Sequence, residues 1–259
     1  MKTKDYAKIY LEKFGNPDLS GKPIFYSLSG AHLFGFPSKD SDWDIRGCFV
    51  VRTKDLLSLK KPRLVIEKMH GDEDLVLHEI EKYIKLIYTP NVNFIEQVNS
   101  PYEIYSRKKY HDKLKELSQL ALTKEAYAHF SGFTKHTEHH AKKEKYMKIK
   151  RDLYLLRMLM QGINVLRTGK FESDIKRLNK KKYFQFPIVD ELVELKVGAE
   201  QSSLKSQRKG NEVKALAAKL TDELNTAYSE TKIKERPTEN DWRKANNFLL
   251  KVRRDFYDY

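Results

Sequence analysis

The chain has 259 residues, of which 40% are hydrophobic and 12% aromatic, a composition typical of a globular protein and not of a disordered one. Its 50 lysines and arginines exceed its 36 acids, which gives a net charge of +14 at pH 7. No apolar run of about 18 residues is present, so we expect no membrane span.

The positive charge is confined to the second part of the chain. Residues 1–105 contain 15 basic and 15 acidic side chains, whereas residues 106–259 contain 35 and 21, so the whole excess of 14 lies after residue 105. Such asymmetry often marks a surface for a polyanion such as nucleic acid. The alternative interpretation is an ordinary solvated, lysine-rich helical surface, which would have the same excess of basic residues.

The first segment, Met1 to Phe14, has apolar residues at helical spacing and is expected to form an amphipathic helix that ends at Gly15. It contains acidic residues and lacks the apolar stretch and cleavage site of a signal peptide. Cys48 is the only cysteine, which excludes a disulfide or a thiolate metal cluster within the chain. These features predict a cytoplasmic protein.

The segments up to residue 79 have strand and turn composition. A short β-rich run is followed by a brief helix-like stretch, a turn-rich loop and three further strands, of which the last two are joined by a hairpin turn. In chain order these segments read PIFYSLSG, AHLFG, PSKDSD, WDIRGCFVV, RLVIEKM, GDED and DLVLHE. The pattern indicates a mixed α/β module.

From Glu79 onward the apolar residues repeat every three to four positions. The segment EIEKYIKLIY places Ile80, Tyr83, Ile84 and Ile87 on one helical face, and most of the later sequence shows the same periodicity, including one long segment from about Lys124 to Leu166. We therefore predict an α+β fold, with a mixed-sheet core over residues 1–105 and a basic helical domain over residues 106–259.

Two aspartates at the start of one predicted strand are the candidate chemical site. Side chains alternate along a strand, so Asp42 and Asp44 project to one face, where their carboxylates are suited to hold Mg²⁺. The turn at Ser29 and Gly30 presents backbone N–H groups that suit a phosphate, because Gly30 has no Cβ in the way. The competing interpretation is that SKDSD is only a solvated polar loop.

A two-metal site needs a third carboxylate on a neighbouring strand. Glu79 fits this role at the end of DLVLHE, and Asp74 and Glu67 are the alternatives. Arg46 lies on the same strand face as Asp44, where it either contacts phosphate or pairs with an aspartate.

The stretch SGAHLFGFPSKDSDWDIRG resembles the signature of the DNA polymerase β-like nucleotidyltransferase superfamily, which pairs a glycine-serine turn with an Asp-x-Asp strand. The run HEIEKYIKLIYTPNVNFIEQVNSPYEIY resembles the branch of predicted nucleotidyltransferases associated with RNA-repair operons and related phage proteins. The segment KIKRDLYLLRMLM is similar to a helix of that branch through Lys150, Tyr154 and Arg157.

The resemblance implies Mg²⁺-dependent transfer of a nucleoside monophosphate from an NTP such as ATP to an acceptor hydroxyl, with release of pyrophosphate. It implies that Asp42, Asp44 and Glu79 are catalytic and bind two Mg²⁺ ions, with Mn²⁺ as a substitute. It also implies that the helical domain closes the active-site cleft. The nucleotide-binding residues that it implies are Ser29, Gly30, Ala31, Arg46, Lys150 and Arg157.

Two positions depart from the family pattern. Ala31 stands where the family commonly has a serine whose hydroxyl reaches the triphosphate, and a lost hydrogen bond to a charged group is worth about 1.5–3 kcal/mol. Glu79 stands where aspartate is usual. These departures leave open a rival function, a catalytically weak or inactive NTP- and RNA-binding module of the same fold.

The acceptor is favoured to be RNA, on the basic second half and the branch resemblance, while small molecules and protein hydroxyls remain open. The segment HTEHH places His136, His139 and His140 on one helical turn, which suits zinc. No cysteine or second cluster supports that interpretation, and lysines crowd the same helix. The sequence specifies neither the preferred NTP nor the oligomeric state.

Overall fold

The computed structural model describes residues 21–39, 41–70, 73–89, 91–141, 147–198, 203–204 and 207–258. The helix expected over residues 1–14 lies outside these ranges. The described chain divides into two compact units. The first comprises residues 21–33, 42–122 and 236–258, and the second comprises residues 34–41 and 123–235.

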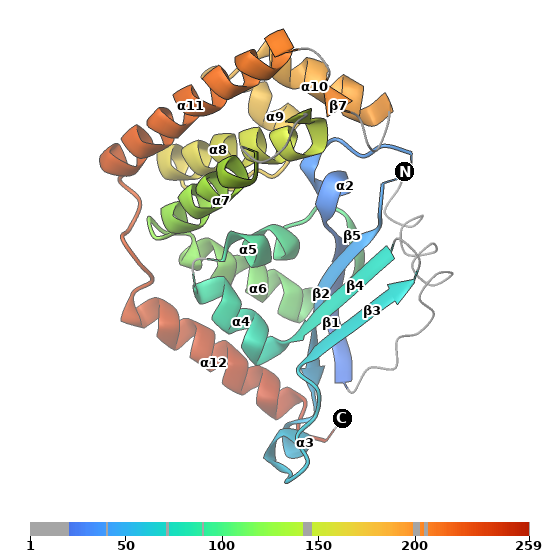
Figure 1. The fold of residues 1–259 in the computed structure, drawn as a ribbon. Helices are drawn as coiled ribbons and strands as arrows, with labels where there is room; N and C mark the ends of the chain where they lie inside the picture. The colour runs from blue at the N-terminus through green and yellow to red at the C-terminus, as the bar shows by residue number, and fades with distance from the viewer. Residues whose placement is uncertain are drawn as a thin grey trace. The chain divides into compact units, whose positions relative to one another are not determined.

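A five-stranded mixed sheet forms the centre of the first unit (Figure 1). Its strand order is β3-β4-β2-β1-β5, in which β2 and β4 run parallel and every other neighbouring pair is antiparallel. The strands are β1 (Gly21–Leu28), β2 (Asp44–Val51), β3 (Val65–His70), β4 (Glu73–Glu79) and β5 (Glu103–Ser106). Most side chains of β1 and β2 are buried on both faces, because both strands are central.

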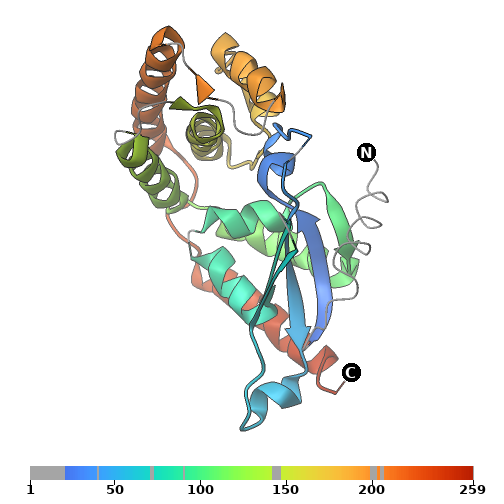
Figure 2. The ribbon, with the colours of Figure 1, turned by 45° about the vertical axis from the view of Figure 1, so that its right-hand side comes forward.

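Helices of the first unit cover one face of this sheet (Figures 1 and 2). The Phe25 ring of β1 stacks on His111, with centroids 4.2 Å apart, and meets Tyr83 edge-on at 5.5 Å. The opposite face carries a separate buried apolar cluster that includes Tyr26, Ile45 and Leu77. The helices are α3 (Thr53–Leu57), α4 (Ile80–Tyr88), α5 (Val92–Val98), α6 (Lys108–Ala121) and α12 (Glu239–Asp255).

The C-terminal helix α12 returns to the first unit and is tied to it by polar contacts. Arg253 forms a two-pronged ion pair with Glu79, at 2.6 and 2.9 Å, and Thr53 Oγ1 donates to the Arg253 carbonyl at 2.6 Å. The helix begins with a capping box, in which Thr238 and Asp241 satisfy each other's backbone N–H groups. These contacts fix α12 against the end of β4.

The described part of the second unit consists mainly of four helices of 12 to 24 residues, the five-residue helix α9 and a two-stranded ladder. Helix α8 is its centre, because every residue from 155 to 166 is buried and α7, α10 and α11 all pack against it. The elements are α7 (Ala126–Ala141), β6 (Met147–Lys148), α8 (Ile149–Thr168), α9 (Ile175–Asn179), α10 (Pro187–Gly198), β7 (Ser203–Leu204) and α11 (Gln207–Glu230). The segment of helical periodicity from about Lys124 to Leu166 contains helix α7 and most of helix α8.

The expected α+β class is confirmed, as are the four strands and the apolar stripe of α4, in which Ile80, Tyr83, Ile84 and Ile87 are all buried. The first unit also contains α6 and α12, which lie beyond the predicted boundary at residue 105. Within the described ranges, no helix is both long enough and apolar enough to cross a membrane.

Candidate active site

The glycine turn after β1 packs directly on the second aspartate of the motif. Gly30 begins the short helix α2 (Gly30–Phe34) with a positive φ of 59°, and a Cβ built on it would lie 1.9 Å from Asp44 Oδ2. The Ser29 N–H donates to the Asp44 carbonyl at 2.8 Å. A glycine is therefore required here both by the left-handed backbone and by the carboxylate that fills the space.

Asp44 and Asp74 lie side by side on neighbouring strands. They are partners in the parallel β2–β4 register, and partners in a sheet share a face. Arg46 Nη2 lies 3.1 Å from Asp44 Oδ1 and 2.7 Å from Asp74 Oδ2, while its Nη1 donates to the Asp74 carbonyl at 2.9 Å. One guanidinium thus holds two half-exposed carboxylates together.

The electrostatics of this face extend along β4. His78 lies four residues after Asp74, so it is on the same face, with its ring edge-on to Phe94 at 5.0 Å. Partial burial, together with the positive charges of Lys82 and Arg46, lowers the pKa of His78 to about 4. The imidazole is therefore neutral at physiological pH, and the face gains no further positive charge from it.

Asp42 lies just outside the sheet. Strand β2 begins at Asp44, and Asp42 is an exposed residue of the irregular segment that leads into it. Trp43 stands between the two aspartates, and its carbonyl accepts from the Asp74 N–H at 3.2 Å. The pairing of the two strands thus continues to the position next to Asp42. Its role as a ligand stays a prediction.

The structure does not bring Glu79 to these aspartates. Glu79 is paired with Phe49 in the register, five positions along the strands from the Asp44–Asp74 pair, which is about 16 Å. Its side chain is 1% exposed, accepts from the Glu81 N–H at 2.9 Å and is bound by Arg253. Glu79 therefore caps α4 and anchors α12, and its carboxylate is already satisfied.

Two of the three basic residues predicted to bind nucleotide, Lys150 and Arg157, lie on α8 in the second unit. Arg157 is only 2% exposed, and its guanidinium stacks 3.6 Å above the Phe34 ring. It also donates to Gln161 Oε1 at 3.3 Å. These contacts show a packing role for Arg157, and nucleotide contacts by either residue stay a prediction.

The loop between the glycine turn and Asp42 belongs to the second unit and is held there by buried polar contacts. Lys196 of α10 is fully buried and donates to Ser38 Oγ at 3.2 Å. Gly35 has a φ of 89° and lies so close to Asp174 that a Cβ would be 2.4 Å from its Oδ1. Gly35 and Ser38 thus pack against residues of the helical second unit.

The carboxylates fit a hard divalent cation. Oxygens from two strands converge on one cationic centre, the Arg46 Nη2, and carboxylate oxygen is the donor that Mg²⁺ prefers. Among the described residues, no group of three or more His, Cys, Asp or Glu is arranged to hold a metal ion. Asp44 and Asp74 are the two carboxylates that this geometry brings together, and Asp42 as a further ligand stays a prediction.

The sequence had placed Asp74 among the alternatives to Glu79. The signal that favours Asp74 is the parallel pairing of β2 with β4, which aligns residue 44 with residue 74. Local patterns do not contain that register. Ser29 and Gly30 lie at Asp44 as expected, and Ala31 is buried on α2 with 5% exposure.

The sequence matches the RNA repair pathway DNA polymerase beta family over residues 11–251. It is 34% identical over 234 residues to an uncharacterized protein of Methanocaldococcus jannaschii, covering 89% of this chain and 94% of that protein. It is 29% identical over 143 residues to an uncharacterized protein of Bacillus subtilis, covering 54% and 55% of the two chains.

Proposed function

The chain belongs to the RNA repair pathway DNA polymerase beta family, and from this membership we propose that it transfers a nucleoside monophosphate from an NTP to an acceptor hydroxyl. The resemblance seen over residues 27–50 is confirmed by the match, and nucleotidyltransferase-type activity is what such membership indicates. Dependence on Mg²⁺, release of pyrophosphate and RNA as the acceptor are the finer parts of the proposal.

The observation that carries the proposal is the convergence of Asp44 and Asp74 on one cationic centre, next to a glycine that leaves room for the Asp44 carboxylate. Like charges this close repel unless a cation lies between them. Arg46 supplies that positive charge in the structure.

Each residue then has a role that its position supports. Asp42, Asp44 and Asp74 would hold Mg²⁺, with Asp74 in the place that the sequence suggested for Glu79. Bound Mg²⁺ would supply positive charge to the transferring phosphoryl group and lower the pKa of the attacking hydroxyl. Arg46 has a planar fork of donors suited to phosphate oxygens. The space beside the Gly30 Cα is taken by the Asp44 carboxylate, so the role of Gly30 is to make room for that carboxylate.

The experiment is a transfer assay that leaves the acceptor unspecified. The protein is incubated with each α-³²P-labelled NTP, Mg²⁺ or Mn²⁺ and total cell extract, and an Asp42→Asn/Asp44→Asn variant serves as the control. Label in RNA that requires the intact aspartates is the expected result. Label in protein or in a small molecule would support the transferase activity and would show that the acceptor is not RNA. Absence of transfer under every condition would overturn the proposal.

A second candidate function is a binding module of the same fold without turnover. It is favoured by Ala31, a buried residue that offers no hydroxyl to a triphosphate. If the protein is a binding module, the wild type transfers no label. The Asp42→Asn/Asp44→Asn variant then keeps the wild-type affinity for NTP and RNA. The transfer assay therefore separates the two functions directly.

A further inference from the structure

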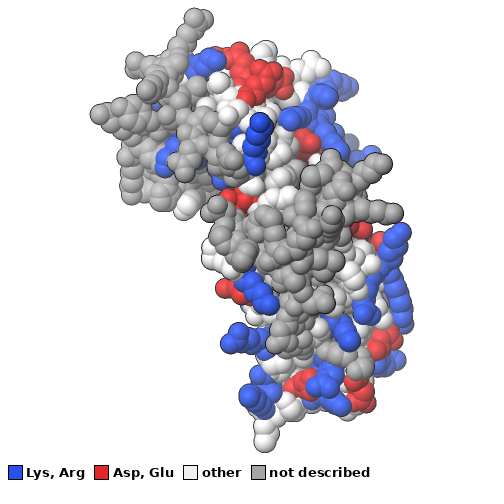
Figure 3. Space-filling view, turned by 90° about the vertical axis from the view of Figure 1, so that its right-hand side faces the viewer, with Lys and Arg blue, Asp and Glu red and all other residues white. Residues whose placement is uncertain are grey.

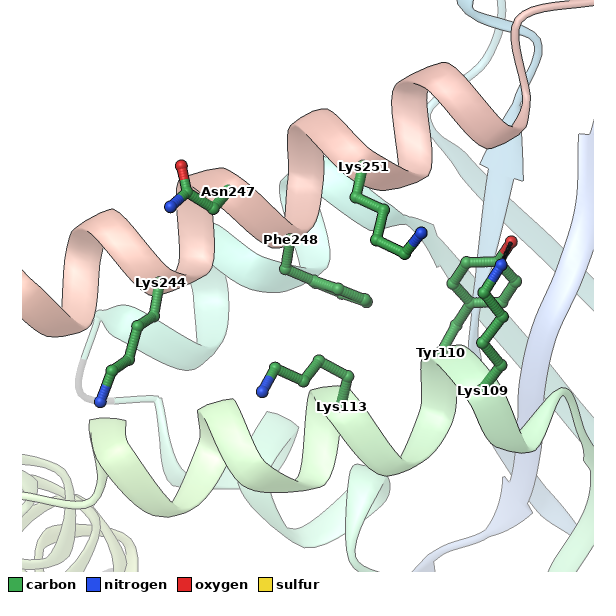
Figure 4. A pocket seen from close by; sticks show the side chains of 7 residues that line it. All are labelled: Lys109, Tyr110, Lys113, Lys244, Asn247, Phe248 and Lys251. Atoms are coloured by element: carbon green, nitrogen blue, oxygen red, sulfur yellow. Dashed lines mark hydrogen bonds between the residues drawn. The ribbon is translucent and has the colours of Figure 1, made fainter.

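A second candidate site lies in the first unit, between helices α6 and α12. It is an open pocket of about 420 Å³, a volume within the range of ligand pockets. In Figure 4 the Phe248 ring and the Lys113 side chain extend into the gap between the helices, and Lys244 reaches from α12 toward α6. The lining residues are Lys109, Tyr110, Lys113, Lys244, Asn247, Phe248 and Lys251.

The pocket is strongly basic. Four of its seven lining residues are lysines and none is acidic. Asp255 pairs with Lys109 at 2.9 Å and with Lys251 at 3.5 Å, so one end is partly neutralised. Lys113 pairs with the exposed Glu116. Four positive charges thus face two carboxylates, which leaves an excess of two that an anionic ligand would offset.

Lys244 stands out among the four. No hydrogen bond or ion pair joins its ammonium group to another residue in the part of the chain that the structure describes. The sequence of α12 from Trp242 to Arg254 contains no acid, and its basic residues besides Lys244 are Arg243, Lys251, Arg253 and Arg254. Arg253 is bound to Glu79, and the others are exposed.

The floor of the pocket is apolar and aromatic. Phe248 and Tyr110 are 6% and 8% exposed, so their rings are covered largely by the helices and the lysine stems. Asn247, on the lining of the same pocket, offers an amide donor and acceptor. Cations around an apolar floor with one amide suit a nucleotide unit, whose phosphate is anionic and whose ribose and base have apolar faces.

Net charge alone would not single out this place. On the face drawn in Figure 3, lysine and arginine side chains are interspersed with aspartate and glutamate, and they do not gather into one uniformly basic surface. The α6–α12 pocket differs because its lysines share one hollow and outnumber the acids that contact them. Its charge is therefore local and suited to a defined ligand.

The pocket is separate from the aspartates. The Tyr110 N–H donates to the Arg107 carbonyl at 2.9 Å, and the Arg107 N–H donates to the Ile24 carbonyl of β1 at 2.8 Å. Ile24 is four residues, or about 13 Å, along β1 from Leu28, which pairs with Ile45 beside Asp44. A mononucleotide bound at the aspartates would not extend to the pocket, whereas a strand of several nucleotides is long enough.

We propose that the α6–α12 pocket binds the sugar-phosphate backbone of single-stranded RNA, at a distance from the candidate active site. The lysines contact phosphates, and the floor of Phe248 and Tyr110 contacts ribose or base. The idea that this RNA is the acceptor rests on the proposed function, but the binding itself does not. An acidic peptide is the rival ligand and is included in the test.

The test measures binding of a fluorescently labelled single-stranded oligoribonucleotide of about 16 nucleotides, without NTP or metal, by anisotropy over a range of salt concentrations. The pocket variant is Lys113→Gln/Lys244→Gln. The matched control is Lys60→Gln/Lys214→Gln, which removes the same charge from two exposed lysines elsewhere. Thermal melting of both variants verifies that these surface changes leave the fold intact.

The pocket variant is expected to bind RNA roughly tenfold more weakly at low salt, with the slope of log K against log[salt] reduced by about 1.4, the value for two lost phosphate contacts. The control is expected to change affinity by less than about twofold. Equal weakening in both variants would overturn the site and assign RNA binding to net charge. Equal competition by polyglutamate would overturn RNA as the ligand.

The outcome is independent of the transfer assay. The Asp42→Asn/Asp44→Asn variant is expected to bind the oligoribonucleotide as tightly as the wild type, because its changes are remote from the pocket. Failure of transfer with intact pocket-dependent binding would reject the proposed function alone. Normal transfer with no effect of the pocket variant on RNA binding would reject the pocket alone.

Discussion

Gly30 and Asp44 act as one structural unit at the candidate site. The Asp44 carboxylate occupies the space that a Cβ at position 30 would fill, and the Gly30 backbone is left-handed. An alanine at position 30 therefore meets two penalties, one from the backbone of about 1–2 kcal/mol and one from the clash with Asp44. The clash is relieved only if the carboxylate moves away from its present position.

We predict that Gly30→Ala abolishes most of the transfer activity while the protein remains folded. The displaced Asp44 carboxylate no longer converges with Asp74, and loss of one preorganised charged group typically costs about 10²–10³ in rate. Stability is expected to fall by only a few kcal/mol. Label transfer and urea unfolding, measured on the same preparation, check both parts. Full activity in this variant would contradict the placement of Asp44.

Substitution of Asp74 and substitution of Glu79 are expected to have opposite effects on activity and stability. Asp74→Asn is expected to reduce transfer by at least about 100-fold with little change in stability, because Asp74 is solvent-accessible at the candidate site. Glu79→Gln is expected to retain transfer but to destabilise the fold, because Arg253 loses its charged partner in a buried position. Transfer rates per folded molecule measure the effect of each substitution on activity, and melting temperatures measure its effect on stability. The reverse pattern would restore Glu79 to the active site.

Strand β4 shows what one element contributes at three successive places. Its start carries Asp74 beside Asp44, and its last two residues are the partly buried His78 and then Glu79, which caps α4. Alternation and apolar content predict that this segment is a strand. Which acid lies beside Asp44 depends on the parallel register with β2, a pairing between segments about 30 residues apart that no local pattern encodes.

Other elements also show that local sequence patterns predict local structure but not the pairing of distant segments. The stripe of Ile80 and Ile84 predicts α4 because it is periodic within nine residues. Strand β5 was not predicted, because its four residues are stabilised by pairing with β1 and by no strong local preference. The periodicity over residues 124–166 likewise does not specify where α7 ends and α8 begins, since both helices have it.

His78 makes the stability of β4 depend on pH. Its pKa is about 4 in the folded state, lowered mainly by burial, against about 6.5 in an unfolded chain. Between these values the unfolded state binds a proton that the folded state does not, so stability rises with pH. The contribution is complete above pH 6.5 and is lost as pH falls toward 4.

We therefore predict that His78→Gln loses less stability between pH 7 and pH 5 than the wild type does. The other titrating groups, including the buried His111 whose pKa is also lowered by burial, are common to both proteins and cancel in the comparison. Urea midpoints at the two pH values give the measurement. An equal loss in both proteins would mean that His78 is protonated in the folded state.

At the scale of the whole molecule, each compact unit is built from distant parts of the sequence. The first unit recruits residues 236–258, and the second recruits residues 34–41 from between the glycine turn and Asp42. The Glu79–Arg253 pair joins residues 174 positions apart. The expectation of a core over residues 1–105 followed the change in periodicity and charge, and neither signal reveals that a C-terminal helix folds back.

Helix α12 is expected to contribute to the stability of the first unit. Removal of residues 236–259 takes away the partner of Glu79 and the ring contacts of Trp242 with Tyr88 and of Phe256 with Tyr110. Burial of each large apolar side chain contributes about 1.5–3 kcal/mol, so the loss is comparable with the roughly 5–15 kcal/mol that holds a typical domain together.

The truncated chain is expected to lose at least roughly 10 °C in melting temperature, or to show no cooperative transition for the first unit. Arg253→Ala, which retains the helix and removes only the ion pair, is expected to fall between the truncated and full-length proteins. Calorimetry on all three gives the order. A truncated chain that melts within about 2 °C of the full chain would show that α12 adds nothing to the core, as a boundary at residue 105 requires.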